Sequence, residues 1–293
     1  MSRSNPYDAI ATAYLPLLQP SAAIPLPSLL SASFPVALDA PKVLLFSPHP
    51  DDECLTGALP LRLLRESQFN VINVAVTLGS NQARQAERWQ ELTKACEYLQ
   101  FGLVLSREGG LKSVNPKIRQ NDPQAWQESV KAIAHLLQSH QPEIVFCPHR
   151  GDRHSTHIGT HYLVMDALAQ MPDDFACWIV ETEYWGAIAN PNLMIESSVE
   201  DVADLMAATA FHQGEVNRNP YHLRLPAGMA DNVRRGGELV GSAGGDVPAF
   251  AFATLYRLER WQKGQKQLPP EGGQWVASGD DLGNIFPIKQ IGL

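Results

Sequence analysis

The feature that most constrains the fold of this chain is a regular alternation of short apolar runs with helix-like stretches. Strands are predicted at residues 43–46, 71–76, 103–105, 143–147, 176–181 and 250–257. Helices are predicted at residues 53–65, 83–99, 126–139, 157–170 and 199–213. Strands that alternate with helices predict an α/β fold, in which a mostly parallel sheet carries helices on both faces.

The predicted organisation has three parts. Residues 1–40 form an N-terminal arm that is rich in Pro, Ala, Ser and Leu, with a short helix near residues 7–18. Residues 41–262 form the main domain, and residues 263–293 form a C-terminal tail that packs on the domain or on a neighbouring subunit. Within the first predicted helix, Pro60 is expected to kink or shorten the helix.

Composition narrows the class of protein. The 293 residues include 23 Lys and Arg against 31 Asp and Glu, a net charge of −8, which argues against nucleic acid as the main partner. No apolar stretch approaches the length of a membrane span, and residues 1–5 are not followed by a clean apolar core with a small-residue cleavage site. We therefore expect a cytoplasmic protein. Its four separated cysteines are expected to be buried free thiols.

The first chemical motif, Ser-Pro-His-Pro-Asp-Asp-Glu at residues 47–53, follows the predicted strand 43–46 and precedes a predicted helix. It therefore lies at a strand-to-helix turn, where open α/β folds place their ligand sites. His49 and Asp52 are three residues apart across the turn, so both side chains can point into one cleft. Asp51 and Asp52 diverge at a helix start, so that one can bind a metal such as zinc while the other faces water.

A second cluster follows the predicted strand 143–147. Four of the nine histidines, His149, His154, His157 and His161, lie within thirteen residues and offer a third ligand. Both clusters follow parallel strands and therefore meet at one edge of the sheet. A His-Asp-His site with a position left for water is typical of catalytic zinc, which lowers the pKa of water to about 7. A carboxylate that accepts the water proton would complete a hydrolytic centre.

Residues 48–53, Pro-His-Pro-Asp-Asp-Glu, resemble the signature of the PIG-L/LmbE-like zinc deacetylases, which remove N-acetyl groups from amino sugars. Residues 152–157, Asp-Arg-His-Ser-Thr-His, match the spacing of that family's second motif, typically His-Pro-Asp-His preceded by Asp-Arg. The resemblance covers about residues 42–215. It implies a Rossmann-like sheet, in agreement with the pattern of strands and helices.

The resemblance also implies roles for single residues. His49, Asp52 and His157 would bind one Zn²⁺ per chain, although two His and one Asp with open positions also suit Fe²⁺. Asp51 would be the general base. His154 would stabilise the oxyanion and protonate the leaving amine. A weaker match at residues 88–91, Arg-Trp-Gln-Glu, implies that Arg88 faces the substrate.

The chain departs from the family pattern at two places. Ser155 and Thr156 replace the usual Pro-Asp, and the loss of that carboxylate is expected to weaken the acid role of His154, unless Asp152 or Asp51 compensates. Residues 78–81, Leu-Gly-Ser-Asn, stand where the family often has Gly-Glu. This change predicts an altered acyl or sugar specificity.

Simpler roles stay open for several of these residues. Asp51 and Asp52 could only cap a helix, and Arg88 could form an ion pair on a helix surface. His161, one turn beyond His157, is an alternative ligand. Core packing is the simpler interpretation of three aromatic residues that could also stack on a sugar: Trp178, Tyr184 and Trp185.

The sequence thus predicts a zinc-dependent hydrolase that removes an N-acetyl or other N-acyl group from a small amino-sugar substrate. One alternative is an amidase that acts on a non-sugar natural-product amide. Another is a catalytically weakened metal-binding module. The sequence leaves homo-oligomerisation open.

Overall fold

The computed structural model describes residues 12–13, 24, 26–28, 36–37, 39–241, 247–267 and 272–287. Most of the predicted arm, including the helix expected near residues 7–18, lies outside these ranges. Confirming the expectation for the cysteines, Cys54, Cys96, Cys147 and Cys177 are all buried and unpaired. Among the described residues, no helix combines the length and the apolar character that a membrane span requires.

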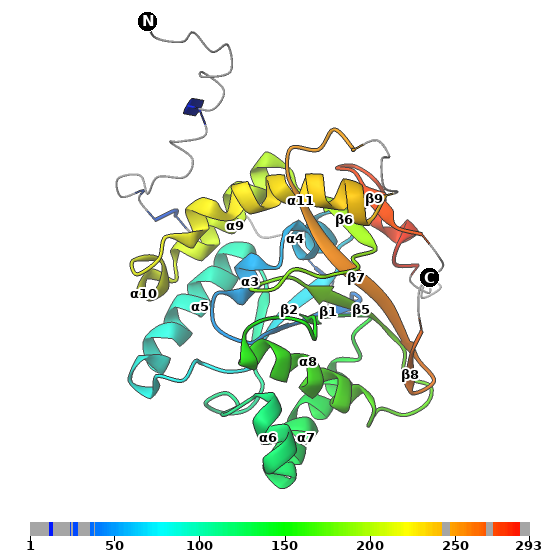
Figure 1. The fold of residues 1–293 in the computed structure, drawn as a ribbon. Helices are drawn as coiled ribbons and strands as arrows, with labels where there is room; N and C mark the ends of the chain where they lie inside the picture. The colour runs from blue at the N-terminus through cyan, green and yellow to red at the C-terminus, as the bar shows by residue number, and fades with distance from the viewer. Residues whose placement is uncertain are drawn as a thin grey trace, which may run out of the picture.

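A nine-stranded sheet forms the centre of the described structure, in the order β3-β2-β1-β4-β5-β7-β6-β9, with β8 paired to β7 (Figure 1). The strands are β1 (Lys42–Ser47), β2 (Asn70–Ala75), β3 (Gly102–Leu105), β4 (Ile144–Pro148), β5 (Cys177–Thr182), β6 (Leu193–Glu196), β7 (Ala253–Gln262), β8 (Gln265–Gln267) and β9 (Gln274–Val276). The first five strands all pair in parallel. β7 runs antiparallel to β5, β6 and β8, so the predicted mostly parallel sheet is confirmed.

Helices cover both faces of this sheet, as Figure 1 shows. They are α3 (Asp52–Leu55), α4 (Ala58–Arg65), α5 (Gln85–Leu99), α6 (Pro116–Asn121), α7 (Pro123–His140), α8 (Ser155–Leu168), α9 (Val199–Ala210), α10 (Gln213–Val216) and α11 (Leu225–Leu239). The side chains of β1 show why helices pack on both faces of the sheet. Val43 and Leu45 pack into the core formed with α4, α5 and α9, whereas Leu44 and Phe46 pack into the core formed with α7 and α8. Both faces of the strand are buried, which accounts for its continuous apolar run.

The break in the first predicted helix lies at Gly57 and not at Pro60. Gly57 has φ 92° and ψ −173°, a conformation that is essentially restricted to glycine. It separates α3 from α4, and a Cβ there would lie 2.3 Å from Thr254 Oγ1. Pro60 falls in the first turn of α4, where its missing N–H has no partner to lose. The predicted helix is therefore shortened, but the break lies before Ala58, at Gly57, and not at Pro60.

One helix that the sequence analysis did not predict, α11, lies beyond the last predicted helix. Met229 and Val233 of α11 are buried, and Val233 packs with Met194 of β6 and Leu255 of β7. Gly236 allows this close approach, because a Cβ there would lie 2.2 Å from the Met194 sulfur. Gly236 therefore serves the packing of this helix on the sheet. Beyond β7, β9 joins the same sheet.

Other element boundaries also differ from the prediction. The strand expected at residues 250–257 is β7, which starts and ends later in the sequence. The helix expected at residues 199–213 ends at Ala210, and a separate short helix, α10, begins at Gln213. The helix expected at residues 157–170 begins at Ser155, so that His154 occupies its N-cap.

Replacing Gly57 by Ala is expected to lower the free energy of unfolding by about 2–5 kcal/mol, because backbone strain adds to overpacking against Thr254. Gly109 provides the control, since it also has a positive φ (73°) but a Cβ added there would meet no atom within 4 Å. Gly109→Ala should lose only about 1 kcal/mol. Urea unfolding of both variants measures the difference. Equal losses would contradict the packing role of Gly57.

Candidate functional site

The two motifs meet at the carboxyl end of the parallel strands, as predicted. β1 pairs with β2 on one side and with β4 on the other, so the strand order reverses direction there. Such switch points open a crevice at the strand ends. His49 follows β1, His154 lies in the loop after β4, and His157 lies in the first turn of α8. Tyr184 follows β5.

Three ligand atoms converge at this point. His49 Nδ1 lies 3.2 Å from His157 Nε2. Asp52 Oδ2 lies 3.3 Å from His49 Nδ1 and 3.4 Å from His157 Nε2. Tetrahedral zinc with Zn–N bonds of about 2.0–2.1 Å sets neighbouring ligand atoms about 3.3 Å apart. The spacing and the donor types therefore fit a metal ion held by these three residues.

Burial and charge favour a cation at this cluster. His157 is fully buried and Asp52 is almost fully buried. Burial works against a charged ring, but Asp52 and Asp152 together raise the pKa of His157 to about 10. Burial likewise opposes ionisation of Asp52, but His157 and His49 lower its pKa. A metal cation could take the place of the proton that these carboxylates stabilise.

Asp152 supports the far side of the His157 ring. Its Oδ2 lies 3.7 Å from His157 Nδ1 and accepts hydrogen bonds from the backbone N–H groups of Trp185 (3.0 Å) and Gly186 (3.3 Å). Its Oδ1 accepts one from the His154 N–H at 2.7 Å. His157 Nδ1 is buried and has no hydrogen-bond partner among the described residues, so Asp152 acts on the ring as a nearby charge, placed where a carboxylate can orient a ligand imidazole. The sequence had suggested Asp152 only as a substitute for a missing partner of His154.

His154 lies beside the cluster and is exposed. Its ring centroid is 4.8 Å from that of His49 and 5.1 Å from that of His157. His154 Nδ1 accepts a hydrogen bond from the Thr156 N–H at 3.3 Å, which assigns the proton of the neutral ring to Nε2. Burial and the neighbouring rings of His49 and His157 lower the pKa of His154. His49, His154 and His157 also offer nitrogens within 4.8 Å of one another, so His154 is an alternative ligand.

Asp51 lies next to the cluster in an unusual backbone conformation, with φ 116°. Its N–H donates to Glu53 Oε2 at 2.9 Å, and its Oδ2 accepts a hydrogen bond from the Tyr221 hydroxyl at 2.6 Å. Burial and the nearby Asp52 carboxylate raise the pKa of Asp51 to about 7. A carboxylate with such a pKa suits a general base at neutral pH. Tyr221 was missed in the sequence, because no periodic pattern marks its segment.

A buried ion pair lies behind Asp51. Glu53 Oε1 and His212 Nε2 are 2.7 Å apart, and both side chains are fully buried. Burial alone would lower the pKa of His212, but Glu53 raises it. Cys54 Sγ donates to Glu53 Oε1 at 3.1 Å. These three residues are close enough to hold a metal ion. Their contacts join α3 to the segment after α9.

Arg88 reaches the same loop from α5. Its Nη2 donates to the Pro50 carbonyl oxygen at 2.7 Å and lies 3.8 Å from Asp51 Oδ1. Its Nε lies 3.8 Å from Glu215 Oε1, and the side chain is only 13% exposed. Arg88 therefore contacts the loop that carries Asp51. Its contact with a substrate stays a prediction.

The other two histidines of the second cluster point elsewhere. His161 Nδ1 is 2.9 Å from the Pro148 carbonyl oxygen and 3.6 Å from Glu181. His149 Nε2 is 2.8 Å from the Gly186 carbonyl oxygen. Neither ring contacts the group formed by His49, Asp52 and His157 in the described structure.

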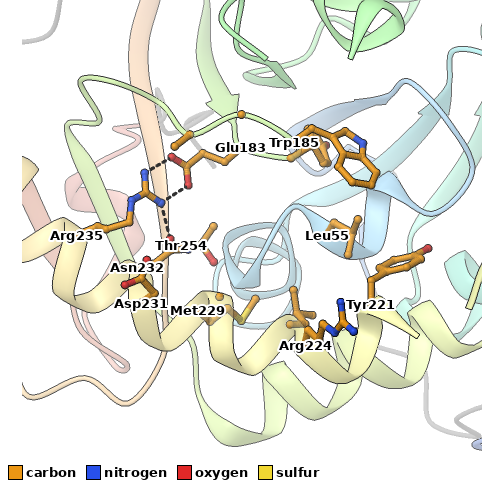
Figure 2. A pocket seen from close by; sticks show the side chains of 15 residues that line it. Leu55, Glu183, Trp185, Tyr221, Arg224, Met229, Asp231, Asn232, Arg235 and Thr254 are labelled. Atoms are coloured by element: carbon orange, nitrogen blue, oxygen red, sulfur yellow. Dashed lines mark hydrogen bonds and ion pairs between the residues drawn. The ribbon is translucent and has the colours of Figure 1, made fainter. Parts of the chain in front are cut away.

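A cleft of about 350 Å³ adjoins the site (Figure 2). Tyr221 connects them, because it lines the cleft and donates to Asp51. Tyr184 also lines the cleft, and its ring packs edge-on against His157 at 4.9 Å. Trp185 is 66% exposed, so the core-packing interpretation is wrong for this residue. The remaining lining comes mainly from α11 and β7, at residues Leu225, Gly228, Met229, Asp231, Asn232, Arg235 and Thr254.

Comparison with known proteins identifies a family match. Residues 44–168 match the PIG-L family, described as GlcNAc-PI de-N-acetylase, and the resemblance predicted from the motifs is confirmed. A 1D-myo-inositol 2-acetamido-2-deoxy-alpha-D-glucopyranoside deacetylase from Mycobacterium leprae is 25% identical over 188 residues. Its counterpart from Mycolicibacterium smegmatis is 27% identical over 179 residues. Each alignment covers 52% of this chain and only 61% of the relative.

Solved structures share the fold at low sequence identity. N,N'-diacetylchitobiose deacetylase from Pyrococcus horikoshii has a TM-score of 0.54 at 16% identity, covering 90% of this chain and 96% of its own. GalB, the 4-carboxy-2-hydroxymuconate hydratase from Pseudomonas putida, has a TM-score of 0.54 at 15% identity, covering 80% and 99%. A deacetylase and a hydratase therefore share this fold, so the fold alone does not select the reaction.

The positive φ of Asp51 (116°) predicts how two substitutions at this position differ in stability. Asp51→Gly is expected to be more stable than Asp51→Ala by about 1 kcal/mol, because glycine adopts a positive φ freely while alanine keeps the strain. Urea unfolding measures both variants. An Asp51→Ala protein as stable as Asp51→Gly would show that the backbone is not strained.

The three-atom cluster predicts which histidines are needed to bind a divalent cation. Zn²⁺ titration of metal-free protein should show one tight site per chain, lost in His157→Ala and kept in His154→Ala, because only His157 belongs to the closely spaced set. His135→Ala, which changes an exposed histidine, is the control. Loss of binding in His154→Ala with retention in His157→Ala would reverse the assignment.

Proposed function

Because residues 44–168 belong to the PIG-L family, we propose that this protein is a metal-dependent hydrolase that removes an N-acetyl or similar N-acyl group from an amino-sugar substrate. The observation that carries the proposal is the placement of Asp51 beside the closely spaced ligand atoms of His49, Asp52 and His157. This arrangement joins a cation site to a carboxylate whose pKa is near 7.

The proposed ligands of one Zn²⁺ per chain are His49, Asp52 and His157. The same donor set suits Fe²⁺. When bound, such a cation supplies Lewis-acid activation of the acyl carbonyl and of the attacking water.

The side chains of this protein handle the protons. Asp51 accepts a proton from the water that attacks the acyl carbon, and the Tyr221 hydrogen bond orients its carboxylate. His154 Nε2 donates to the oxygen that gains negative charge. The C–N bond then breaks, and the amine leaves with a proton, giving a carboxylic acid and a free amino sugar.

Thr156, which stands where the family usually has Asp, affects the protonation of His154. Among the described residues, no carboxylate takes the place of the missing family Asp at His154 Nδ1; instead the Thr156 N–H donates there. This contact favours a neutral ring, because protonation of Nδ1 would break it. We therefore assign His154 chiefly as a neutral hydrogen-bond donor, with Asp51 able to return its proton to the leaving amine.

The substrate class is supported by the relatives. The named substrates of the mycobacterial and archaeal proteins are acetylated amino sugars. The cleft here has a volume within the range of small-molecule sites, and the exposed Trp185 offers a face on which a sugar ring can stack.

Asp51→Asn is expected to lower kcat/KM by at least about a hundredfold, the lower end for loss of a general base. Acetate release from N-acetylglucosamine derivatives and from simple N-acetylated amines measures it, with metal content determined in the same samples. Asp174→Asn, which changes an exposed turn residue, is the control and should behave as wild type.

The outcomes separate the alternatives. Retention of most activity in Asp51→Asn would remove Asp51 as the base. Turnover of the simple amides alone would replace the sugar substrate by a non-sugar amide. Absence of hydrolysis from every compound by metal-loaded wild type would favour a metal-binding module.

A further inference from the structure

The charged side chains that line the cleft differ in whether they have a partner of opposite charge. Arg235 makes a forked pair with Glu183, at 3.1 and 2.8 Å. Asp231 accepts a hydrogen bond from Arg234 Nε at 2.8 Å. Arg224 also lines the cleft and is exposed, and its side chain makes no hydrogen bond or ion pair with any residue that the structure describes. Among the charged residues that line the cleft, Glu183, Arg224, Asp231 and Arg235, Arg224 is therefore the one whose side chain has no partner within the described part of the chain.

Arg224 lies close in the chain to a residue that contacts the proposed base, Asp51. Arg224 ends the short helical segment Tyr221–Arg224, whose first residue donates to Asp51. In the view of Figure 2, Leu55 lies between Trp185 and Arg224. Trp185 and Arg224 thus line the same cleft as Tyr221, the residue that donates to Asp51.

We propose that this cleft selects amino-sugar substrates that carry an anionic group, either phosphate or carboxylate, and that Arg224 binds this group while Trp185 covers the sugar ring. The inference rests on the proposed hydrolase function and specifies its substrate. A guanidinium matches both anions with two parallel hydrogen bonds. Because the chain as a whole carries a net charge of −8, a cation in the cleft favours the approach and binding of an anionic group there.

Matched substrates test the proposal. The methyl glycoside of N-acetylglucosamine is the neutral compound. N-acetylglucosamine 1-phosphate, N-acetylglucosamine 6-phosphate and N-acetylmuramic acid carry phosphate or carboxylate at different positions. Wild type should hydrolyse at least one anionic compound with kcat/KM about tenfold above the neutral one. That ratio should fall as salt is added, because Arg224 is exposed.

Substitutions test whether Arg224 causes the preference for anionic over neutral substrates. Arg224→Gln should remove it, and Arg224→Glu should turn it against the anionic compounds by like-charge repulsion. Arg107→Gln is the control. Arg107 is exposed, follows the edge strand β3 and does not line the cleft, so its loss should leave the preference unchanged.

A binding measurement is independent of turnover. Calorimetry with glucosamine 1-phosphate and glucosamine 6-phosphate uses protein kept metal-free by a chelator, so that the phosphate cannot bind a metal. Arg224→Gln should bind the better ligand about tenfold more weakly than wild type.

The results distinguish the two proposals. Equal hydrolysis of neutral and anionic compounds, or an anion preference that persists in Arg224→Gln, overturns the role of Arg224 and leaves the hydrolase function standing. Failure to hydrolyse any compound overturns the hydrolase function. Equal binding of the phosphorylated amines by wild type and Arg224→Gln overturns the anion site in either case.

Discussion

The carboxylate of Asp52 is the contact on which the site depends. Its Oδ2 accepts the His49 N–H at 2.8 Å and lies within 3.4 Å of ring nitrogens of both His49 and His157. One oxygen thereby ties the loop after β1 to the start of α8. Because these groups are largely shielded from water, the attraction between them is strong. The partners of the site are arranged around this contact, with Asp152 behind His157 and Asp51 beside Asp52.

Asp51 is held from two directions. Glu53 accepts its backbone N–H and is itself anchored by the buried His212, while Tyr221 donates to its side chain. Glu53 lies in α3, whereas His212 and Tyr221 come from the segments after α9 and before α11. They fix both the backbone and the carboxylate, so the strain at φ 116° is maintained by packing around the residue. A base held in this way needs little reorganisation to accept a proton.

The chemistry and the proposed selectivity arise from different parts of the chain. The family match ends at residue 168 and includes the proposed ligands and base. Apart from Leu55, the cleft lining begins at Glu183 and continues to Thr254. These later elements pack on the sheet through β7, which runs antiparallel to β5. The same reaction site can therefore be combined with a different cleft wall, which agrees with the diversity of proteins that share the fold.

Local sequence alone determined the parallel strands and the two motifs at their ends, because burial on both faces produces continuous apolar runs and strand-to-helix turns follow directly. It also placed His157 and His161 on one helix face. Only the tertiary structure decided between them, since the Pro148 carbonyl holds the His161 ring away while Asp152 directs His157 toward His49. Tyr221 and Arg224 likewise carried no signal in the sequence. Their positions depend on packing of α11 against β6 and β7 through Val233 and Gly236, and contacts between residues distant along the chain leave no periodic pattern.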